Sequence, residues 1–383
     1  MAADNTMTST SSDPRTMTTV NERYYFLDGL RGWAALAVVF WHVFCESYPI
    51  SQAAADFLRF LPPFNGNVAV DLFFVISGFA LSINYAKRRD SKSLARIGAG
   101  RYLRLAIPIL AACTLVHFAM LSESIAPFEL RPTPYNYYLR FEPTFSHLFT
   151  SSLFDVFFRF SKDQVYIVPL WSMQFELIGS AITIGFLAIF GRDKLALWIF
   201  GAALFTVTLI QNSYYSLFVA GMLLANIYVT YDLSGKRFQS LLCLGILLGW
   251  TAPFLTNNDL RSPFFMGSMI IFFSSMIWIT PIRSFFEKKP SLFLGRISFP
   301  LYLLHGPVLW TFSLSLKTML ARFVPIDGNV NFVIGFATVL VSIGVSIAFL
   351  PVEKFAIATS RSFGTWLVNS VNSKIRLLTP KSN

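Results

Sequence analysis

Several segments of this 383-residue chain run for about eighteen or more residues with almost no charge. A helix needs about 20 mainly apolar residues to cross the roughly 30 Å of hydrocarbon in a bilayer. Hydrophobic residues make up 54% of the chain and charged residues 13%, against about 25% charged in an average soluble domain. Too few polar side chains remain to cover a water-exposed surface. The sequence therefore predicts an integral-membrane, multi-pass protein of the all-α class.

The apolar runs predict a polytopic bundle of about ten transmembrane helices. Their expected positions are 30–50, 67–86, 102–121, 167–190, 194–211, 214–230, 239–256, 264–282, 297–318 and 332–353. With the N-terminus inside, 23 of the 31 Lys and Arg residues fall on the inner side and 8 on the outer side. Basic residues gather on the cytoplasmic side of membrane proteins, so both termini are expected in the cytoplasm. The net charge of +11 then reflects topology, and no nucleic-acid partner is expected.

The chain is expected to divide into three regions. Residues 1–23 are rich in Ser and Thr and predict a disordered cytoplasmic tail, 24–358 form the transmembrane domain, and 359–383 form a basic cytoplasmic tail. The longest connection, at 122–166, falls outside, and its many Pro, Tyr and Phe residues suit a lid or an acceptor platform at the membrane face. The three cysteines show no paired spacing, so they are expected to be small core residues, without a disulfide or a metal site.

The stretch LDGLRGWAALAVVFWHVF places Arg31 and His42 eleven residues apart. On an α-helix that separation is about three turns, or ~16 Å, so both side chains lie on one face. Arg31 is expected at the cytoplasmic end and His42 near mid-membrane. For Arg31 by itself, a structural role in anchoring the end of the helix is an equally good explanation. An ionisable group inside the membrane is a functional candidate, however, and His42 is therefore predicted to be catalytic.

Two further ionisable residues are expected at a similar depth. In GRISFPLYLLHGPVLW, His305 follows Arg296 by nine residues, and in VPLWSMQFELIG, Glu176 follows Pro169 into a helix that enters from outside. A carboxylate in hydrocarbon is costly unless it is paired or hydrogen-bonded. A buried histidine is its natural partner, and a structural salt bridge is the alternative. Ser77 is expected to be a packing residue, which is the usual role of small residues in transmembrane helices.

Arg101 and Arg104, in RYLRLAIPIL, stand at the expected cytoplasmic mouth of the third helix and follow a run of basic residues. Positive-inside topology explains most of that run. The forked guanidinium group also suits the phosphates of a nucleotide-like donor.

These residues together resemble the integral-membrane acyltransferase 3 family, which includes O-acetylases of lipopolysaccharide, exopolysaccharide, Nod factors, peptidoglycan and macrolides. The resemblance rests on LDGLRGWAALAVVFWH at 27–42, VDLFFVISGFAL at 70–81, RYLRLAIP at 101–108, LWSMQFELI at 170–178, RISFPLYLLHGPV at 296–308 and VEK at 352–354. The family's functional Arg, with a His eleven residues on, maps to Arg31 and His42. Its paired arginines map to Arg101 and Arg104, and its glutamate maps to Glu176.

The resemblance implies a membrane-bound acyltransferase, with both donor and acceptor as co-substrates. The donor is acyl-CoA, with acetyl-CoA expected, and the acceptor is a hydroxyl of a carbohydrate or related small molecule. No bound cofactor is expected, and membrane lipids surround the protein, in a bacterial cytoplasmic membrane. WSMQFE, Pro300 and Gly306 depart from the usual pattern and leave the acceptor open. The expected catalytic residues are His42, Glu176 and His305, and the expected donor-binding residues are Arg31, Arg101 and Arg104.

Two alternatives concern mechanism and function. The acyl group passes either directly to the acceptor or through a transient acyl-enzyme. A transporter or flippase with a proton relay through His42, Glu176 and His305 would explain the buried charges equally well, but it would not explain the arginines or the motif set. A non-catalytic scaffold would leave these costly groups without a purpose.

Overall fold

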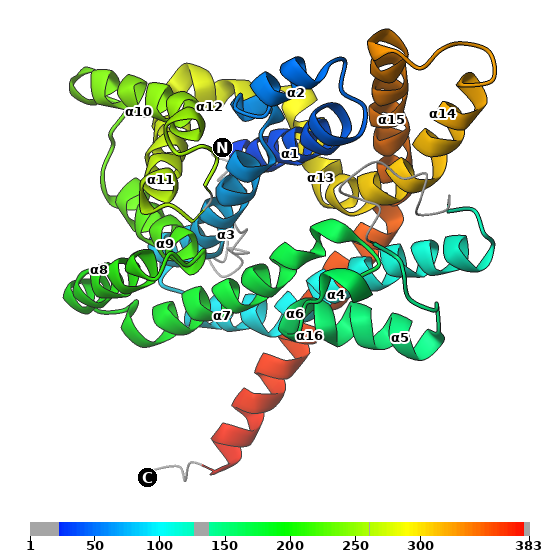
Figure 1. Ribbon diagram of the computed structural model, residues 1–383. Helices are drawn as coiled ribbons and strands as arrows, with labels where there is room; N and C mark the ends of the chain where they lie inside the picture. The colour runs from blue at the N-terminus through cyan, green and yellow to red at the C-terminus, as the bar shows by residue number, and fades with distance from the viewer. Residues whose placement is uncertain (1–22, 126–137, 260, 379–383) are drawn as a thin grey trace, which may run out of the picture.

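The computed structural model describes residues 23–125, 138–259 and 261–378, and every regular element within them is a helix (Figure 1). The expected disordered tail therefore lies almost wholly outside the described residues. The long helices are α1 (Tyr25–Phe40), α3 (Gly66–Arg88), α4 (Ser91–Leu121), α7 (Met173–Phe190), α8 (Lys194–Ile210), α9 (Tyr215–Thr230), α10 (Lys236–Leu255), α11 (Pro263–Trp278), α13 (Lys289–Val308), α15 (Gly328–Ala348) and α16 (Leu350–Leu378). Shorter ones are α2 (Gln52–Leu58), α5 (Phe145–Thr150), α6 (Val156–Phe158), α12 (Thr280–Phe286) and α14 (Leu314–Leu320).

Helices occur at all ten expected positions, which confirms the polytopic helical bundle. By length and composition, six helical stretches of the described chain can cross a membrane, and α11 with α12 makes a seventh if the pair, bent by 87°, is one span. The apolar helices α8 and α9 are shorter, with 17 and 16 residues. The first expected span is α1 continued by a π-helical segment at Trp41–Ser47.

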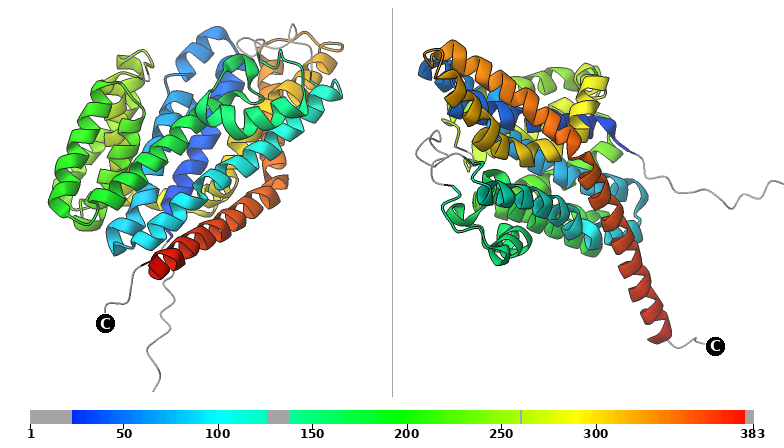
Figure 2. Two further views of the ribbon diagram at one scale, coloured as in Figure 1. Left: turned by 90° about the horizontal axis from the view of Figure 1, so that it is seen from below. Right: turned by 90° about the vertical axis from the view of Figure 1, so that its right-hand side faces the viewer.

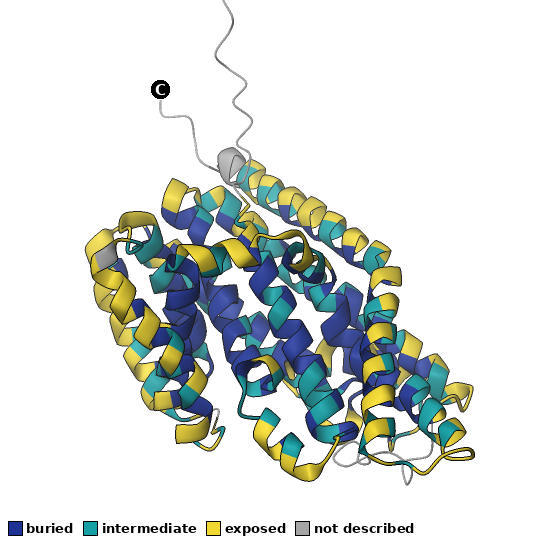
Figure 3. Ribbon diagram, turned by 90° about the horizontal axis from the view of Figure 1, so that it is seen from above, coloured by how far each residue is buried: buried dark blue, intermediate teal, exposed yellow. Residues whose placement is uncertain are grey.

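The outer helices expose apolar side chains, whereas polar side chains are found in the interior. Leu241, Leu244 and Leu247 follow one another along α10 and are all exposed, while Ser180 and Thr183 of α7 are fully buried. Figure 3 shows buried residues in the middle of the bundle and exposed ones along its outer helices. Apolar side chains facing outward are expected where the solvent is lipid.

Helices α1 and α13 make an unusually close contact at the centre of the bundle, where both run in the same direction (Figure 2). A methyl group on Gly32 would overlap the backbone nitrogen of Gly295. The Trp33 indole nitrogen also donates to the Ser291 hydroxyl at 3.0 Å. Small residues allow helix backbones in membranes to approach this closely, and the glycines therefore set the register of the two helices.

Two connections differ from the expectation. The basic stretch before residue 102 is not an open loop, because α4 already begins at Ser91, after a turn in which Arg89 has a φ of 54° and Asp90 caps the helix. The left-handed residue ends α3 abruptly. The connection at 122–166, which is expected outside, is partly helical where it is described, since α5, a π-helical segment and α6 form one continuous helix over 145–158. Residues 126–137 of this connection lie outside the described residues.

Helix α16 passes without interruption through the expected domain boundary at residue 359. It packs antiparallel to α4, where Gly100 lies against Ser360 and Gly364 against Arg96. Its C-terminal part extends beyond the rest of the bundle (Figure 1). The boundaries of the three expected regions therefore remain predictions.

The cysteines are partly as expected. Cys45 and Cys113 are buried, but Cys243 is exposed on α10. The expectation of a core position for Cys243 was wrong, because an apolar run inside a membrane helix has a lipid-facing side as well as a core-facing side.

Candidate active site

Two histidines from different helices meet inside the bundle. The imidazole rings of His42 and His305 are stacked, with centroids 5.2 Å apart and planes inclined by 15°. Gly32 and Gly295, where α1 and α13 touch, each precede a histidine by ten residues. Helices side by side in one direction keep such a register, since both rise equally per residue. The structure thus brings together the two histidines that were predicted to be catalytic.

The immediate surroundings of His42 are polar. His42 lies in the π-helical segment Trp41–Ser47, and its Nδ1 atom is 2.6 Å from Oε2 of Glu46, in the same segment. The two side chains are 19% and 20% exposed. Sequence reasoning missed Glu46, although its position four residues after a candidate histidine was a readable signal.

His305 is enclosed more completely, with 1% of its surface exposed. Its Nδ1 atom lies 3.0 Å from the carbonyl oxygen of Leu301, while its buried Nε2 atom has no hydrogen-bond partner in the described part of the chain. The neighbouring Tyr302 hydroxyl donates to the carbonyl of Pro169 at 2.7 Å and lies 2.8 Å from the Ser172 hydroxyl. Helix α13 is thereby tied to the segment leading into α7.

Glu176 is held by partners other than the expected histidine. Its Oε1 atom accepts a hydrogen bond from Ser77 at 2.7 Å and is paired with the Arg101 guanidinium. Arg101 also donates to the Ser180 hydroxyl at 3.0 Å. The expected contact between Glu176 and a histidine is therefore wrong, and the salt-bridge alternative describes its contacts. Ser77, expected only to pack, is a hydrogen-bond donor that joins α3 to α7.

The arginines expected to bind the donor lie close enough to influence one another. The charges of Glu176 and Arg101 act on the guanidinium of Arg31. The charges of Arg31 and Arg101 act in turn on the guanidinium of Arg104. Arg104 is paired with Glu353 of α16 at 3.0 Å. Arg361 acts on Arg104 as well, and Asp28 acts on Arg31, so four guanidinium groups face three carboxylates in this cluster of described residues. The excess of positive charge suits an anionic ligand.

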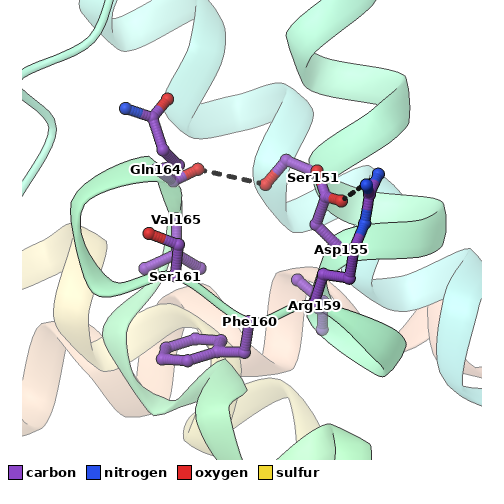
Figure 4. A pocket seen from close by; sticks show the side chains of 8 residues that line it. Ser151, Asp155, Arg159, Phe160, Ser161, Gln164 and Val165 are labelled. Atoms are coloured by element: carbon purple, nitrogen blue, oxygen red, sulfur yellow. Dashed lines mark hydrogen bonds and ion pairs between the residues drawn. The ribbon is translucent and has the colours of Figure 1, made fainter.

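The helix at 145–158 and the loop that follows it line a cavity of about 290 Å³ (Figure 4). The Ser151 hydroxyl donates to the Gln164 carbonyl at 3.3 Å, and Arg159 lies 3.3 Å from Asp155. Phe160 provides an aromatic wall. Hydroxyl, carboxylate, guanidinium and aromatic groups around one cavity are suited to a polar, hydroxyl-bearing molecule.

Tyr138 is near charged residues of both the cavity loop and the histidine pair. Burial raises the pKa of its phenol, and the charges of Glu46 and Asp163 add to the effect. The ring of Tyr138 is stacked against the ring of Trp310, with centroids 6.5 Å apart. Because Asp163 precedes Gln164 at the cavity, the loop after the helix at 145–158 and the carboxylate beside His42 are on the same side of the bundle.

The fold and the site together define a multi-pass helical membrane protein with paired histidines and an arginine cluster in its interior. Residues 24–350 match the family model of the acyltransferase domain of the acyltransferase 3 type. The match covers most of the chain, which therefore belongs to this family of membrane acyltransferases. No curated protein and no solved structure matches the chain.

Proposed function

We propose that the protein transfers an acyl group, with acetyl expected, from acyl-CoA to a hydroxyl of a carbohydrate or related small molecule. The observation that carries this proposal is the placement of Arg31 and His42 on one continuous helix, α1 with its π-helical extension. Arg31 belongs to the arginine cluster and His42 to the histidine pair. A separation of eleven residues is ~16 Å of helix, a span that the extended pantetheine arm of CoA can cover.

The arginine cluster is the proposed site for the CoA phosphates. Arg101 and Arg104 are paired with Glu176 and Glu353, and a phosphate would replace or share these carboxylate partners. Arginine guanidinium groups bind phosphate through bidentate hydrogen bonds, which are stronger than hydrogen bonds between neutral groups. Positive-inside topology places this cluster towards the cytoplasm, where acyl-CoA is made.

The proposed reaction uses His42 as general base. His42 removes the proton of the acceptor hydroxyl as its oxygen attacks the thioester carbonyl carbon. The new carbon–oxygen ester bond forms, the carbon–sulfur bond breaks, and the proton held by His42 passes to the departing CoA thiolate. The transfer needs no reactant other than the acyl-CoA and the acceptor. General-base assistance of this kind contributes about 10² to 10⁴ in rate.

His305 and Glu176 take supporting parts in this proposal. The stacked His305 ring holds the plane of His42. Glu176 acts on the donor side, because its contacts with Ser77 and Arg101 fix the guanidinium in place. This differs from the expectation that Glu176 would orient a histidine.

The acceptor is proposed to arrive from the outer face, opposite the donor. The cavity beside Arg159 and Asp155 belongs to the connection that the positive-inside rule assigns to that face, and it presents groups that bind hydroxyls. In a bacterial cytoplasmic membrane, carbohydrates of the cell envelope would reach it there. Direct transfer fits this arrangement, because donor and acceptor reach His42 from opposite ends of the site.

Thioester consumption by purified protein tests the proposal. Protein in lipid nanodiscs is mixed with acetyl-CoA and a panel of methyl glycosides, and the release of free CoA thiol is followed. We expect thiol release that increases with at least one glycoside, together with an acetylated glycoside in the mass spectrum. A transporter would leave the thioester intact, and that result would reject the proposal.

A further inference from the structure

We infer that Glu46 is the positioning residue of His42: it holds the imidazole with its proton on Nδ1 and leaves Nε2 as the atom that takes the acceptor's proton. The inference deepens the proposed acyl transfer and rests on it. It adds a residue that lies outside the motifs on which the family resemblance was based.

The contact between the two side chains is short and protected. Nδ1 of His42 is 2.6 Å from Oε2 of Glu46, which is shorter than an ordinary hydrogen bond between neutral groups and is typical of a charge-assisted one. Each side chain keeps about a fifth of its surface exposed. The pair is thus largely shielded from water, yet a substrate can still reach it.

The backbone that carries the pair is also held in place. His42 and Glu46 both belong to the π-helical segment Trp41–Ser47. Arg59 donates to the carbonyl of Cys45 in that segment at 3.3 Å, and its guanidinium lies 6.0 Å from the Trp41 ring centroid. Widened helical turns leave backbone groups that need outside partners, and such turns are frequent at functional sites. Arg59 supplies one such partner here.

The proton positions follow from the chemistry of the partners. An ionised carboxylate accepts hydrogen bonds and donates none, so the proton between Glu46 and His42 belongs to Nδ1. In the neutral imidazole the lone pair is then on Nε2. The same reasoning applies to His305, whose Nδ1 faces the Leu301 carbonyl. In both rings Nε2 is the basic atom.

Two contacts at right angles therefore define the orientation of His42. Glu46 holds the edge of the ring through a hydrogen bond in its plane, and His305 covers its face. Glu176 is not available for this role, because Ser77 and Arg101 hold it. A base fixed in one tautomer and one orientation needs no rearrangement before it removes a proton.

The test compares Glu46→Ala and Glu46→Gln with wild type in nanodiscs. A matched control is Asp232→Asn, which removes an exposed carboxylate that accepts a hydrogen bond at 2.6 Å from the hydroxyl of Ser234, two residues away. We expect Glu46→Ala to lower kcat by about 10²-fold, within the range of general-base catalysis, with an unchanged KM for acetyl-CoA. Glu46→Gln keeps an acceptor oxygen, so its kcat should fall between those of Glu46→Ala and wild type, while Asp232→Asn should match wild type.

A spectroscopic measurement separates positioning from general damage. The chain has four histidines, so ring-labelled ¹⁵N-histidine gives a spectrum in which His42→Ala identifies the His42 signals. We expect the Nδ1–H tautomer in wild type and a mixture of tautomers in Glu46→Ala. If Glu46→Ala does not accumulate, Glu46→Gln provides the kinetic comparison.

Wild-type kcat in Glu46→Ala, or an Nε2–H tautomer of His42 in wild type, would overturn the inference. Failure of the proposed function is distinguishable, because wild type would then consume no thioester while the tautomer is still measurable.

Discussion

The Arg104 guanidinium lies 3.0 Å from a carboxylate oxygen of Glu353, so an arginine proposed to bind the donor is held by a residue from the far end of the chain. A phosphate arriving at Arg104 gains a charge-assisted bond, which is worth about 1.5 to 3 kcal/mol. We predict that Arg104→Ala raises the KM for acetyl-CoA by about 10- to 100-fold and changes kcat less. Steady-state kinetics over a range of acetyl-CoA concentrations measures both.

Lys92→Ala is the matched control for Arg104, because it removes an exposed positive charge from the first turn of the same helix. Its KM should equal that of wild type. Equal effects of the two substitutions would mean that the basic residues act only through topology and bulk charge.

Gly32→Ala tests the contact that sets the histidines opposite each other. The added methyl group overlaps the backbone nitrogen of Gly295, and overpacking of this kind costs about 1 to 3 kcal/mol. We expect a lower unfolding temperature and a loss of activity, because the rings of His42 and His305 separate with their helices. Gly344→Ala is the control, since a methyl group there meets nothing within 4 Å. Wild-type activity in Gly32→Ala would show that the stacked geometry is not needed.

The outer cavity predicts a separate effect on the acceptor. Asp155→Ala removes a carboxylate from its lining and frees Arg159 from its ion pair. We expect a higher KM for the methyl glycoside that wild type accepts, with the KM for acetyl-CoA unchanged. Asp193→Ala, on an exposed turn before α8, controls for the loss of a carboxylate elsewhere. If the KM for acetyl-CoA changed instead, the cavity would belong to the donor site and not to the acceptor site.

Sidedness is tested by labelling in intact cells. Single cysteines at Ser91 and Ser146, in a chain lacking its three native cysteines, are treated with a membrane-impermeant maleimide. Ser146 is exposed at the start of α5 and Ser91 begins α4. We expect Ser146→Cys to react in intact cells and Ser91→Cys to react only after the cells are opened. The reverse pattern would place the arginine cluster outside and remove the route for cytoplasmic acyl-CoA.

Much of the fold could be predicted because apolar runs of spanning length have few alternatives in a bilayer. The stacking of His42 on His305 was not predictable in detail, since it depends on where α1 and α13 touch. The pairing of Glu176 with Arg101 was missed for a similar reason. Depth along a helix can be counted from sequence, but the direction of each helix face depends on its neighbours.

The π-helical segment at Trp41–Ser47 was also beyond prediction from the sequence. Its residues continue the helix of the preceding apolar run, and the widened turn is held by Arg59, which lies fourteen residues beyond Cys45 and outside that helix. The sequence predicted a loop at 145–158, where the structure has a continuous helix, because this Phe-rich stretch is shorter than a transmembrane span.

The most direct test of the account measures acetyl-CoA consumption by His42→Ala beside His147→Ala, both purified in nanodiscs. His147 lies on the helix at 145–158, where its imidazole contacts the Gln164 carbonyl at 2.9 Å, so its removal controls for the loss of a histidine. We predict that His147→Ala consumes thioester like wild type, whereas His42→Ala loses about 10² to 10⁴ in rate at a normal amount of membrane protein. Wild-type thioester consumption by His42→Ala would contradict the assignment of His42 as the base.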